Sequence, residues 1–144
     1  MNQVIIYKQD NGTVAIIRPT EEAIELLGID AIALKDVPAG KPYQIVDAST
    51  VPTDRTFRNA WMPDLSVDMP KAREMRKDKL RILRAPKLAA LDIEYNRADE
   101  AGNTTLKAEI AAKKKALRDV TIDPAIAAAI TPEQLKAVMP AILL

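Results

Sequence analysis

The sequence contains neither cysteine nor histidine among its 144 residues. Without cysteine there is no disulfide framework and no thiolate to act as a nucleophile or zinc ligand. Without histidine, the residue that most often serves as a general base or metal ligand near neutral pH is also missing. The four glycines stand singly, so no glycine-rich loop can hold a phosphate. We therefore expect a protein that is not an enzyme and has no cofactor and no metal site.

Long apolar runs are missing as well. No stretch approaches the roughly 20 apolar residues that a membrane-spanning helix needs, and the first residues do not resemble a signal peptide. Only five residues are aromatic, and the apolar content comes mainly from alanine, isoleucine, leucine and valine. Such side chains favour close helix packing or burial against a partner. The sequence predicts a soluble protein made in the cytoplasm, with no membrane partner.

Charge is distributed unevenly along the chain, although the formal net charge is only +1. Residues 1–70 carry ten acidic and six basic side chains, whereas residues 71–87 carry two acidic and eight basic ones. The pattern indicates an acidic head followed by a basic helix.

The head, residues 1–61, is predicted to be a small α+β domain that begins with a β-hairpin. β-branched apolar runs at 3–8 and 13–18 flank Asp10-Asn11-Gly12, a sequence typical of a tight turn. Thr20 can cap a short helix that Gly28 ends, and residues 29–36 predict a second one. Residues 43–47 then predict a third strand. We expect a small antiparallel sheet covered by helix on one face.

The segment 53–61, TDRTFRNAW, holds the only phenylalanine and the only tryptophan of the chain. Arg55, Phe57, Arg58 and Trp61 belong to the residue types that dominate protein–protein hot spots, so one interpretation is a partner-binding anchor. The other is that Phe57 and Trp61 close the core of the head while the arginines are solvated.

Residues 62–69 are polar and proline-marked, and we interpret them as a linker to an all-helical arm at 70–144. Asp68 and Pro70 form a helix-start signal for a helix over 71–84, and Pro86 either kinks that helix or begins a new one.

Two amphipathic helices are predicted beyond Pro86, separated by Gly102-Asn103. Residues of one helical face recur every three or four positions on both sides of this turn, at Leu88, Leu91, Tyr95 and Ala98 and again, nearly as regularly, at Leu106, Ile110, Lys113 and Leu117. A helical hairpin with such narrow stripes buries one face against itself and needs the head or a partner for the rest. We expect association, as a homo-oligomer or within a larger assembly.

The basic helix, residues 71–87, has three interpretations. It can be a solvated charged face, a surface that contacts nucleic acid phosphates, or an arm that binds an acidic protein surface through arginine side chains. The basic residues are spread around the helix without interleaved aromatics, which argues against nucleic acid. The candidate partner-binding residues of this half are Arg73, Arg76, Arg81, Arg84, Leu88, Leu91 and Tyr95. Farther along, Arg118 and Asp119 are expected to hold the terminal segment in place.

Residues 71–140 resemble the small tail proteins of tailed bacteriophages that are grouped as tail assembly chaperones or tail fibre assembly proteins. The resemblance rests on RKDKLRILRAPKLAALD, KKKALRDVT and TPEQLKAVMP. The matching positions are Arg81, Leu88, Leu91, Asp92, Leu117, Arg118, Asp119 and Pro140. The chain departs from the pattern at Met139, where the family usually has tryptophan, and at Ile93, where an aromatic residue is common.

This resemblance implies a non-enzymatic protein that binds other tail or fibre proteins of a phage. It would act as an assembly factor that leaves, or as a structural adaptor retained in the virion. The implied location is the host cytoplasm during assembly and, for a retained protein, the tail. The alternatives are a general protein–protein adaptor and a nucleic-acid accessory protein that uses residues 71–87.

Overall fold

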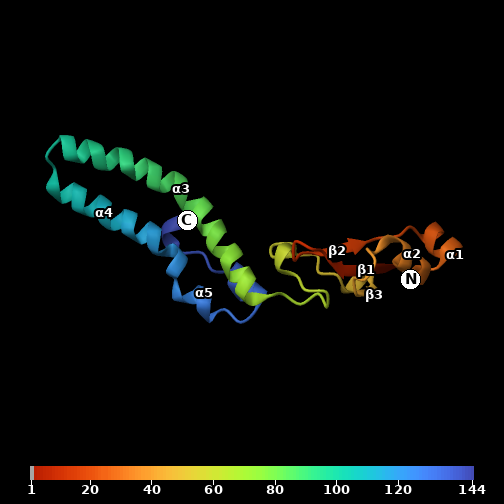
Figure 1. Cartoon of the computed structure of the whole chain (residues 1–144). Coiled ribbons are helices and arrows are strands. Elements are labelled where there is room, and N and C mark those ends of the chain that lie inside the picture. Colours follow the sequence, from red (N-terminus) through yellow and green to blue (C-terminus); the bar gives the residue numbers. More distant parts are fainter. Residues whose placement is uncertain (1) are drawn as a thin grey trace. The chain divides into compact units, whose positions relative to one another are not determined.

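The computed structural model describes residues 2–144, which form two compact units divided between Asp68 and Met69. The first unit combines a three-stranded sheet with short helices, and the second unit is helical (Figure 1). The predicted α+β class is therefore confirmed. None of the helices in residues 2–144 is long and apolar enough to cross a membrane.

The sheet of the first unit is antiparallel and has the strand order β2–β1–β3. The central strand β1 (Gln3–Lys8) pairs with β2 (Val14–Ile17) and with β3 (Tyr43–Asp47). Gly12 has a φ of +83° in the connection between β1 and β2, a conformation that costs glycine little. The β-branched runs thus form the predicted hairpin around the predicted turn.

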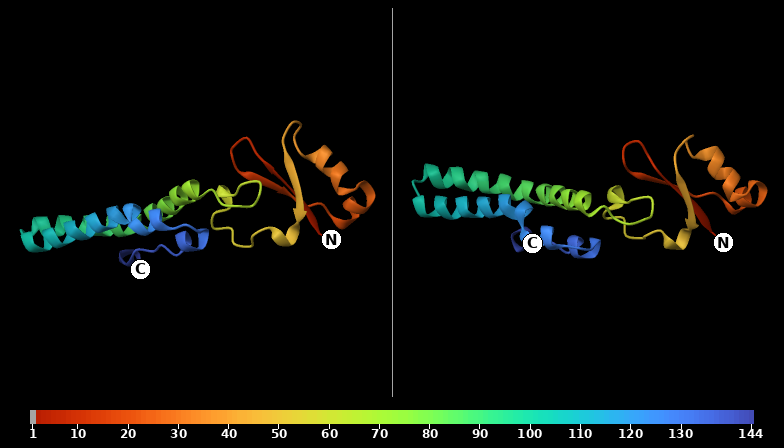
Figure 2. Two further views of the ribbon diagram at one scale, coloured as in Figure 1. Left: turned by 90° about the horizontal axis from the view of Figure 1, so that it is seen from below. Right: turned by 60° about the horizontal axis from the view of Figure 1, so that its bottom comes forward.

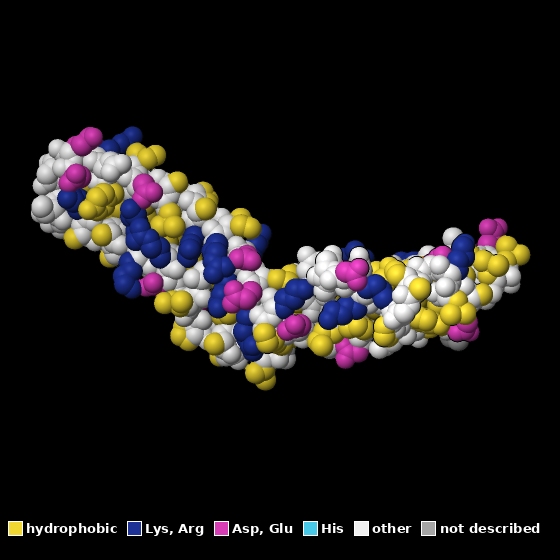
Figure 3. Space-filling view, in the orientation of Figure 1, with side chains coloured by type: hydrophobic (Ala, Val, Ile, Leu, Met, Phe, Trp, Pro, Cys, Tyr) yellow, Lys and Arg dark blue, Asp and Glu magenta, His cyan; other side chains and the backbone are white. Residues whose placement is uncertain are grey.

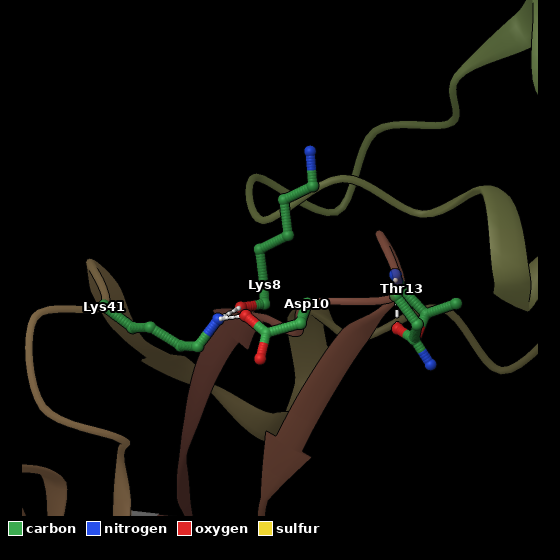
Figure 4. Close-up of polar contacts among 5 residues, drawn as sticks. Lys8, Asp10, Thr13 and Lys41 are labelled. Atoms are coloured by element: carbon green, nitrogen blue, oxygen red, sulfur yellow. Dashed lines mark hydrogen bonds and ion pairs between the residues drawn. The ribbon is translucent and has the colours of Figure 1, made fainter.

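Lys41 ties the hairpin loop to the segment that precedes β3 (Figure 4). Its ammonium group donates a hydrogen bond to the Lys8 carbonyl at 3.4 Å and lies 2.5 Å from Oδ1 of Asp10. Within the loop, Asn11 Oδ1 accepts hydrogen bonds from the backbone N–H and the hydroxyl of Thr13. The hydrogen bond and the positive charge of Lys41 lower the pKa of the Asp10 carboxyl.

Two short helices cover one face of the sheet, α1 (Glu21–Leu27) and α2 (Ile29–Asp36). The predicted cap is present, since Thr20 Oγ1 accepts a hydrogen bond from the backbone N–H of Ala23 at 3.2 Å. On this face Ile5 packs with Ile32, Ala33 and Val37 of α2 and its C-terminal end.

The opposite face of the sheet is also buried, which the sequence did not predict. Val4, Ile6 and Val14 pack there against Val51 and Trp61. The covering chain is the segment after β3, which contains the short 3₁₀ helices η1 (Ala48–Thr50) and η2 (Arg58–Ala60). A sheet with apolar residues on both faces needs this second cover because water would otherwise contact the side chains of β1.

Residues 62–68, interpreted above as part of a linker, lie in the first unit. Trp61 and Val67 form a β-bridge, and the Asp68 N–H donates to the Ala60 carbonyl at 2.8 Å. Leu65 and Val67 pack against the core around Trp61. These contacts order the stretch, so the division between the units falls after Asp68 and not at residue 61.

The second unit is built on a helical hairpin of α3 (Met69–Glu100) and α4 (Thr104–Arg118) (Figures 1 and 2). Asn103 caps α4 through its Oδ1, which accepts from the Leu106 N–H at 3.0 Å. Pro86, predicted to kink the helix or to begin a new one, lies inside α3, which is one helix of 32 residues that bends in its middle part (Figure 1). Leu80, Ala98, Ile110 and Leu117 are buried between the two helices and the tail.

The chain after α4 folds back onto the hairpin (Figure 2). It consists of η3 (Asp119–Ile122), α5 (Pro124–Ala128), α6 (Pro132–Lys136) and η4 (Ala141–Leu143). Each of the two α-helices begins with a capping side chain followed by proline, at Asp123 and Thr131. The buried side chains of this tail are Val120, Ile126, Ala129, Leu135 and Val138.

Candidate interaction surfaces

Three of the four predicted anchor residues in the connector belong to the interior of the first unit. Phe57 and Trp61 are only 5% and 3% exposed. The Arg58 guanidinium lies 4.9 Å from the Trp61 ring centroid, and its NH2 donates to the Val14 carbonyl at 2.8 Å. Burial lowers the pKa of Arg58. Of the four residues, Arg55 is the one whose side chain is exposed.

Three arginines of α3 hold the tail of the same chain. Arg73 NH2 donates to the Ala129 carbonyl at 2.9 Å, and Arg84 NH1 donates to the Arg118 carbonyl at 2.7 Å. Arg76 donates from both Nε and NH2 to the Val138 carbonyl, at 3.0 and 2.5 Å. We call Arg73, Arg76 and Arg84 the arginine clamp. These side chains were predicted to bind a partner, and the structure shows them bound within the chain.

The carbonyls bound by the arginine clamp share a position in the fold. Arg118 is the last residue of α4, Ala129 is the C-cap of α5, and Val138 follows the C-cap of α6. Carbonyls at the C-terminal end of a helix have no intrahelical donor and carry partial negative charge. The guanidinium groups of Arg84 and Arg73 therefore bind carbonyls at the C-terminal ends of α4 and α5, and that of Arg76 binds a carbonyl just beyond α6.

Arg76 is the most enclosed member of the clamp, since it is 7% exposed. Burial lowers its pKa, but a guanidinium remains charged near neutral pH because its ordinary pKa exceeds 12. The two hydrogen bonds to Val138 thus compensate a desolvated charge. Sequence reasoning missed this role because the partners are main-chain atoms 62 residues away.

The predicted stripe of Leu88, Leu91 and Tyr95 is half-buried at the α3–α4 contact. The ammonium groups of Lys107 and Lys114 lie 5.4 and 5.3 Å from the Tyr95 ring centroid. Tyr95 therefore contributes to the contact between α3 and α4.

The same two lysines pair with carboxylates of α3. Lys107 lies 2.5 Å from Asp99, and Lys114 lies 2.5 Å from Asp92. The hydrogen bond to Asp99 raises the pKa of Lys107. Cation–π contacts and ion pairs from the same lysines thus join α4 to α3.

Arg81 and the segment 118–119 complete the set of predicted residues. Arg81 points to solvent and pairs with Asp78 at 2.5 Å. Asp119 pairs with Lys115 of α4, while Arg118 takes part in holding the tail through its carbonyl. Arg118 thus joins the end of α4 to α3 through its main chain, and the ion pair of Asp119 is with α4, so the expectation that these two residues secure the terminal segment stays a prediction.

Exposed apolar side chains form the surfaces that sequence reasoning did not select. In the first unit they lie on α1 and α2, where Leu26, Leu27 and Leu34 are 83%, 56% and 77% exposed. In the second unit Ile82 and Ile93 of α3 are 67% and 55% exposed. A sequence signal for the first group existed, since α1 has more leucine and isoleucine than one helical face can bury.

Among the described residues, no group of three or more carboxylates is arranged to hold a metal ion. The chain matches no protein-family model, no curated protein sequence and no solved structure.

Proposed function

We propose that this chain is a non-enzymatic bacteriophage tail protein that binds other tail or fibre proteins. The proposal draws on the resemblance of residues 71–140 to small phage tail proteins. It also draws on the construction of the chain from two units that each bury a core and still expose large apolar side chains. The protein would act in the host cytoplasm during assembly and would remain in the tail if it is a structural adaptor.

The observation that carries the proposal is the leucine surface of the first unit, formed by Leu26, Leu27 and Leu34. Ala23 and Ile24 of α1 pack against the core in part, whereas Leu26 and Leu27 of the same helix are exposed to solvent. Full burial of a leucine stabilises a complex by about 1.5–3 kcal/mol. Covering this surface with a tail or fibre subunit would remove three such side chains from water, which is the physical role of an assembly partner.

Acidic side chains border the leucine surface. Glu21, Glu22 and Glu25 are exposed on α1, and hydrophobic and acidic side chains gather together at the α1 end of the first unit (Figure 3). An apolar centre with a charged rim is the usual composition of a protein–protein interface. The partner surface that fits it is apolar with basic residues at its edge.

Binding is tested with purified tail and fibre proteins of the phage that encodes the chain. The double variant Leu26→Asp/Leu34→Asp should lose binding to its partner while its far-UV circular dichroism stays unchanged, because neither leucine supports the core. The matched control is Leu144→Asp, which changes a leucine that is 87% exposed in the other unit. Equal binding by wild type and double variant would contradict the role of this surface.

Mass spectrometry of purified particles separates the two mechanisms. Presence at a fixed copy number in the tail would identify a structural adaptor. Absence from particles, together with a complex with unassembled subunits, would identify an assembly factor that leaves. If the protein is found neither in particles nor in a complex with unassembled subunits, the proposal is refuted. Salt-dependent binding to DNA, found in that case, would favour the nucleic-acid accessory function.

A further inference from the structure

The outward face of α3 is apolar over its middle third. Ile82, Ala85, Pro86, Ala89 and Ile93 recur at spacings of three and four, and all five are exposed. The run covers about 17 Å of helix, at 1.5 Å per residue. Hydrophobic side chains follow the upper edge of the second unit over α3 (Figure 3). We call these five residues the outer α3 face.

The opposite face of α3 explains why the outer α3 face has no cover within this unit. The arginine clamp and the half-buried stripe direct the other side of the helix toward the tail and α4. Ile82 and Ile93 lie on the opposite side of the helix from the arginine clamp and the half-buried stripe. A rotation of α3 that buried the two isoleucines against α4 and the tail would therefore expose the clamp and the stripe. Isoleucine at two outward positions of a helix is better matched to a second helix than to water.

Charges on α3 are separated on either side of this face. Residues 71–84 contain seven basic and two acidic side chains, whereas residues 88–100 contain one basic and four acidic ones. The exposed cations nearest the face on the first side are Lys79 and Arg81, and Glu94 and Glu100 are exposed on the second. Lys79, Glu94 and Glu100 form no ion pair within residues 2–144, so these charges are available to another molecule.

We propose that the outer α3 face binds a second copy of this chain, with the two α3 helices antiparallel. A two-fold axis that passes beside residues 87 and 88 places Ile82 of one copy against Ile93 of the other. The same axis brings Pro86 against Ala89. The face is thus complementary to itself, as an isologous interface requires.

Charge complementarity selects the antiparallel orientation. In that arrangement the basic N-terminal part of each α3 lies along the acidic C-terminal part of the other, and Lys79 approaches Glu94 and Glu100 of the second copy. A parallel pair would place like charges side by side along both ends, which is unfavourable. The small side chains of Ala85 and Ala89 allow the helices to approach closely at the centre.

This self-association goes beyond the proposed function and does not depend on it. It is measured on the purified chain alone, whereas the leucine surface is tested with a tail or fibre protein. Either proposal can therefore fail while the other stands.

The first test is the oligomeric state by analytical ultracentrifugation across about 1 µM to 1 mM protein, a range that spans the affinity expected of a small interface. The wild type should dimerise, and Ile82→Asp should weaken the dimer by about tenfold or more. The matched control is Ile130→Asp, at a residue of the tail that is 76% exposed. A monomeric wild type, or equal weakening by both variants, would overturn the proposal. Circular dichroism confirms that both variants remain folded.

The second test is disulfide cross-linking, which the absence of native cysteine makes specific. Under oxidising conditions Ile82→Cys/Ile93→Cys should form a covalent dimer, because residues 82 and 93 of the two copies face each other. Ile82→Cys alone should not, since its two copies lie about 17 Å apart along the helices, beyond the roughly 7 Å Cα separation that a disulfide tolerates. Cross-linking of the single variant would show a parallel pair and overturn the proposal. Failure of the double variant to cross-link would also overturn it.

Discussion

Replacement of Arg76 by methionine should release the end of the tail from α3. The Arg76 guanidinium donates two hydrogen bonds to the Val138 carbonyl and is 7% exposed. Methionine keeps the length and most of the volume of the side chain but offers the carbonyl no donor. A hydrogen bond from a charged group contributes about 1.5–3 kcal/mol, and an unsatisfied buried carbonyl costs a similar amount. Removal of a desolvated charge offsets part of this, so we expect a loss of about 2 kcal/mol.

The expected effect is local, because the arginine clamp connects the tail to a hairpin that retains its own contacts. With two compact units in one chain, a single global unfolding transition would not isolate it. Amide hydrogen exchange measures the local opening of the tail directly. The amides of Leu135, Ala137 and Val138 donate within α6 and its C-terminal turn, and a loss of about 2 kcal/mol accelerates their exchange about 30-fold.

The matched control is Arg81→Met, on the same helix. Arg81 is exposed and pairs with Asp78 of the same helix, so its loss should change exchange in α6 by less than about twofold. Arg76→Lys keeps the charge but has a single donor group and should fall between the two. Equal exchange rates at Val138 in the Arg76→Met and Arg81→Met variants would refute the clamp.

Three further changes test the fold. Trp61→Ala should destabilise the first unit by about 3–5 kcal/mol in chemical denaturation, because it empties a buried site under the sheet; a folded first unit of unchanged stability would contradict this. Lys41→Met should raise the pKa of Asp10 in an NMR carboxyl titration, since the hydrogen bond and charge that lower it are removed. The low folded-state pKa stabilises the hairpin loop above the ordinary aspartate pKa, and this stabilisation is lost as pH falls through the folded pKa, so the variant should be less sensitive to acid. Pro86→Ala should stabilise α3 by about 2 kcal/mol, because the carbonyl of Ile82 gains a helical hydrogen-bond donor that proline lacks. Guanidinium denaturation followed by circular dichroism of the helices measures this change. Unchanged or lower stability would contradict the idea that Pro86 costs the helix a hydrogen bond.

Local signals predicted the elements of the chain well. The hairpin followed from β-branched runs around Gly12, and the start of α1 from the capping hydroxyl of Thr20. Asn103 likewise marks the start of α4. Each of these features depends on residues within a few positions of one another, which sequence patterns record directly.

Pro86 shows where a local rule held in part, because the helix bends but does not end there (Figure 1). Proline removes one helical hydrogen bond and favours a break, yet α3 passes through it. Both Pro86 and Ile82 face solvent, so water can satisfy the freed carbonyl. The helix bends in its middle part, as expected at a proline (Figure 1).

The roles of Trp61 and the arginines required long-range information. Hot-spot composition is the same for a tryptophan that binds a partner and for one that covers the second face of a sheet. Only the packing of Trp61 with Val4, Ile6 and Val14 distinguishes the two. The targets of Arg73 and Arg76 are main-chain carbonyls 56 and 62 residues away, which no charge pattern encodes.

The arginine clamp changes what the basic helix implies about partners. Eight basic residues in seventeen positions indicate an anionic partner when all are assumed to face outward. Three of them instead donate hydrogen bonds to carbonyls at or just beyond the C-terminal ends of α4, α5 and α6, so their donors already have partners within the chain. Exposed cations such as Lys79 and Arg81 border an apolar surface between Ile82 and Ile93. An apolar centre with charges of opposite sign at its two ends fits a helix of matching pattern better than a polyanion. We therefore propose that the second unit contacts its partner through the outer α3 face. The most basic side of the helix instead stabilises the fold by binding the tail and the end of α4.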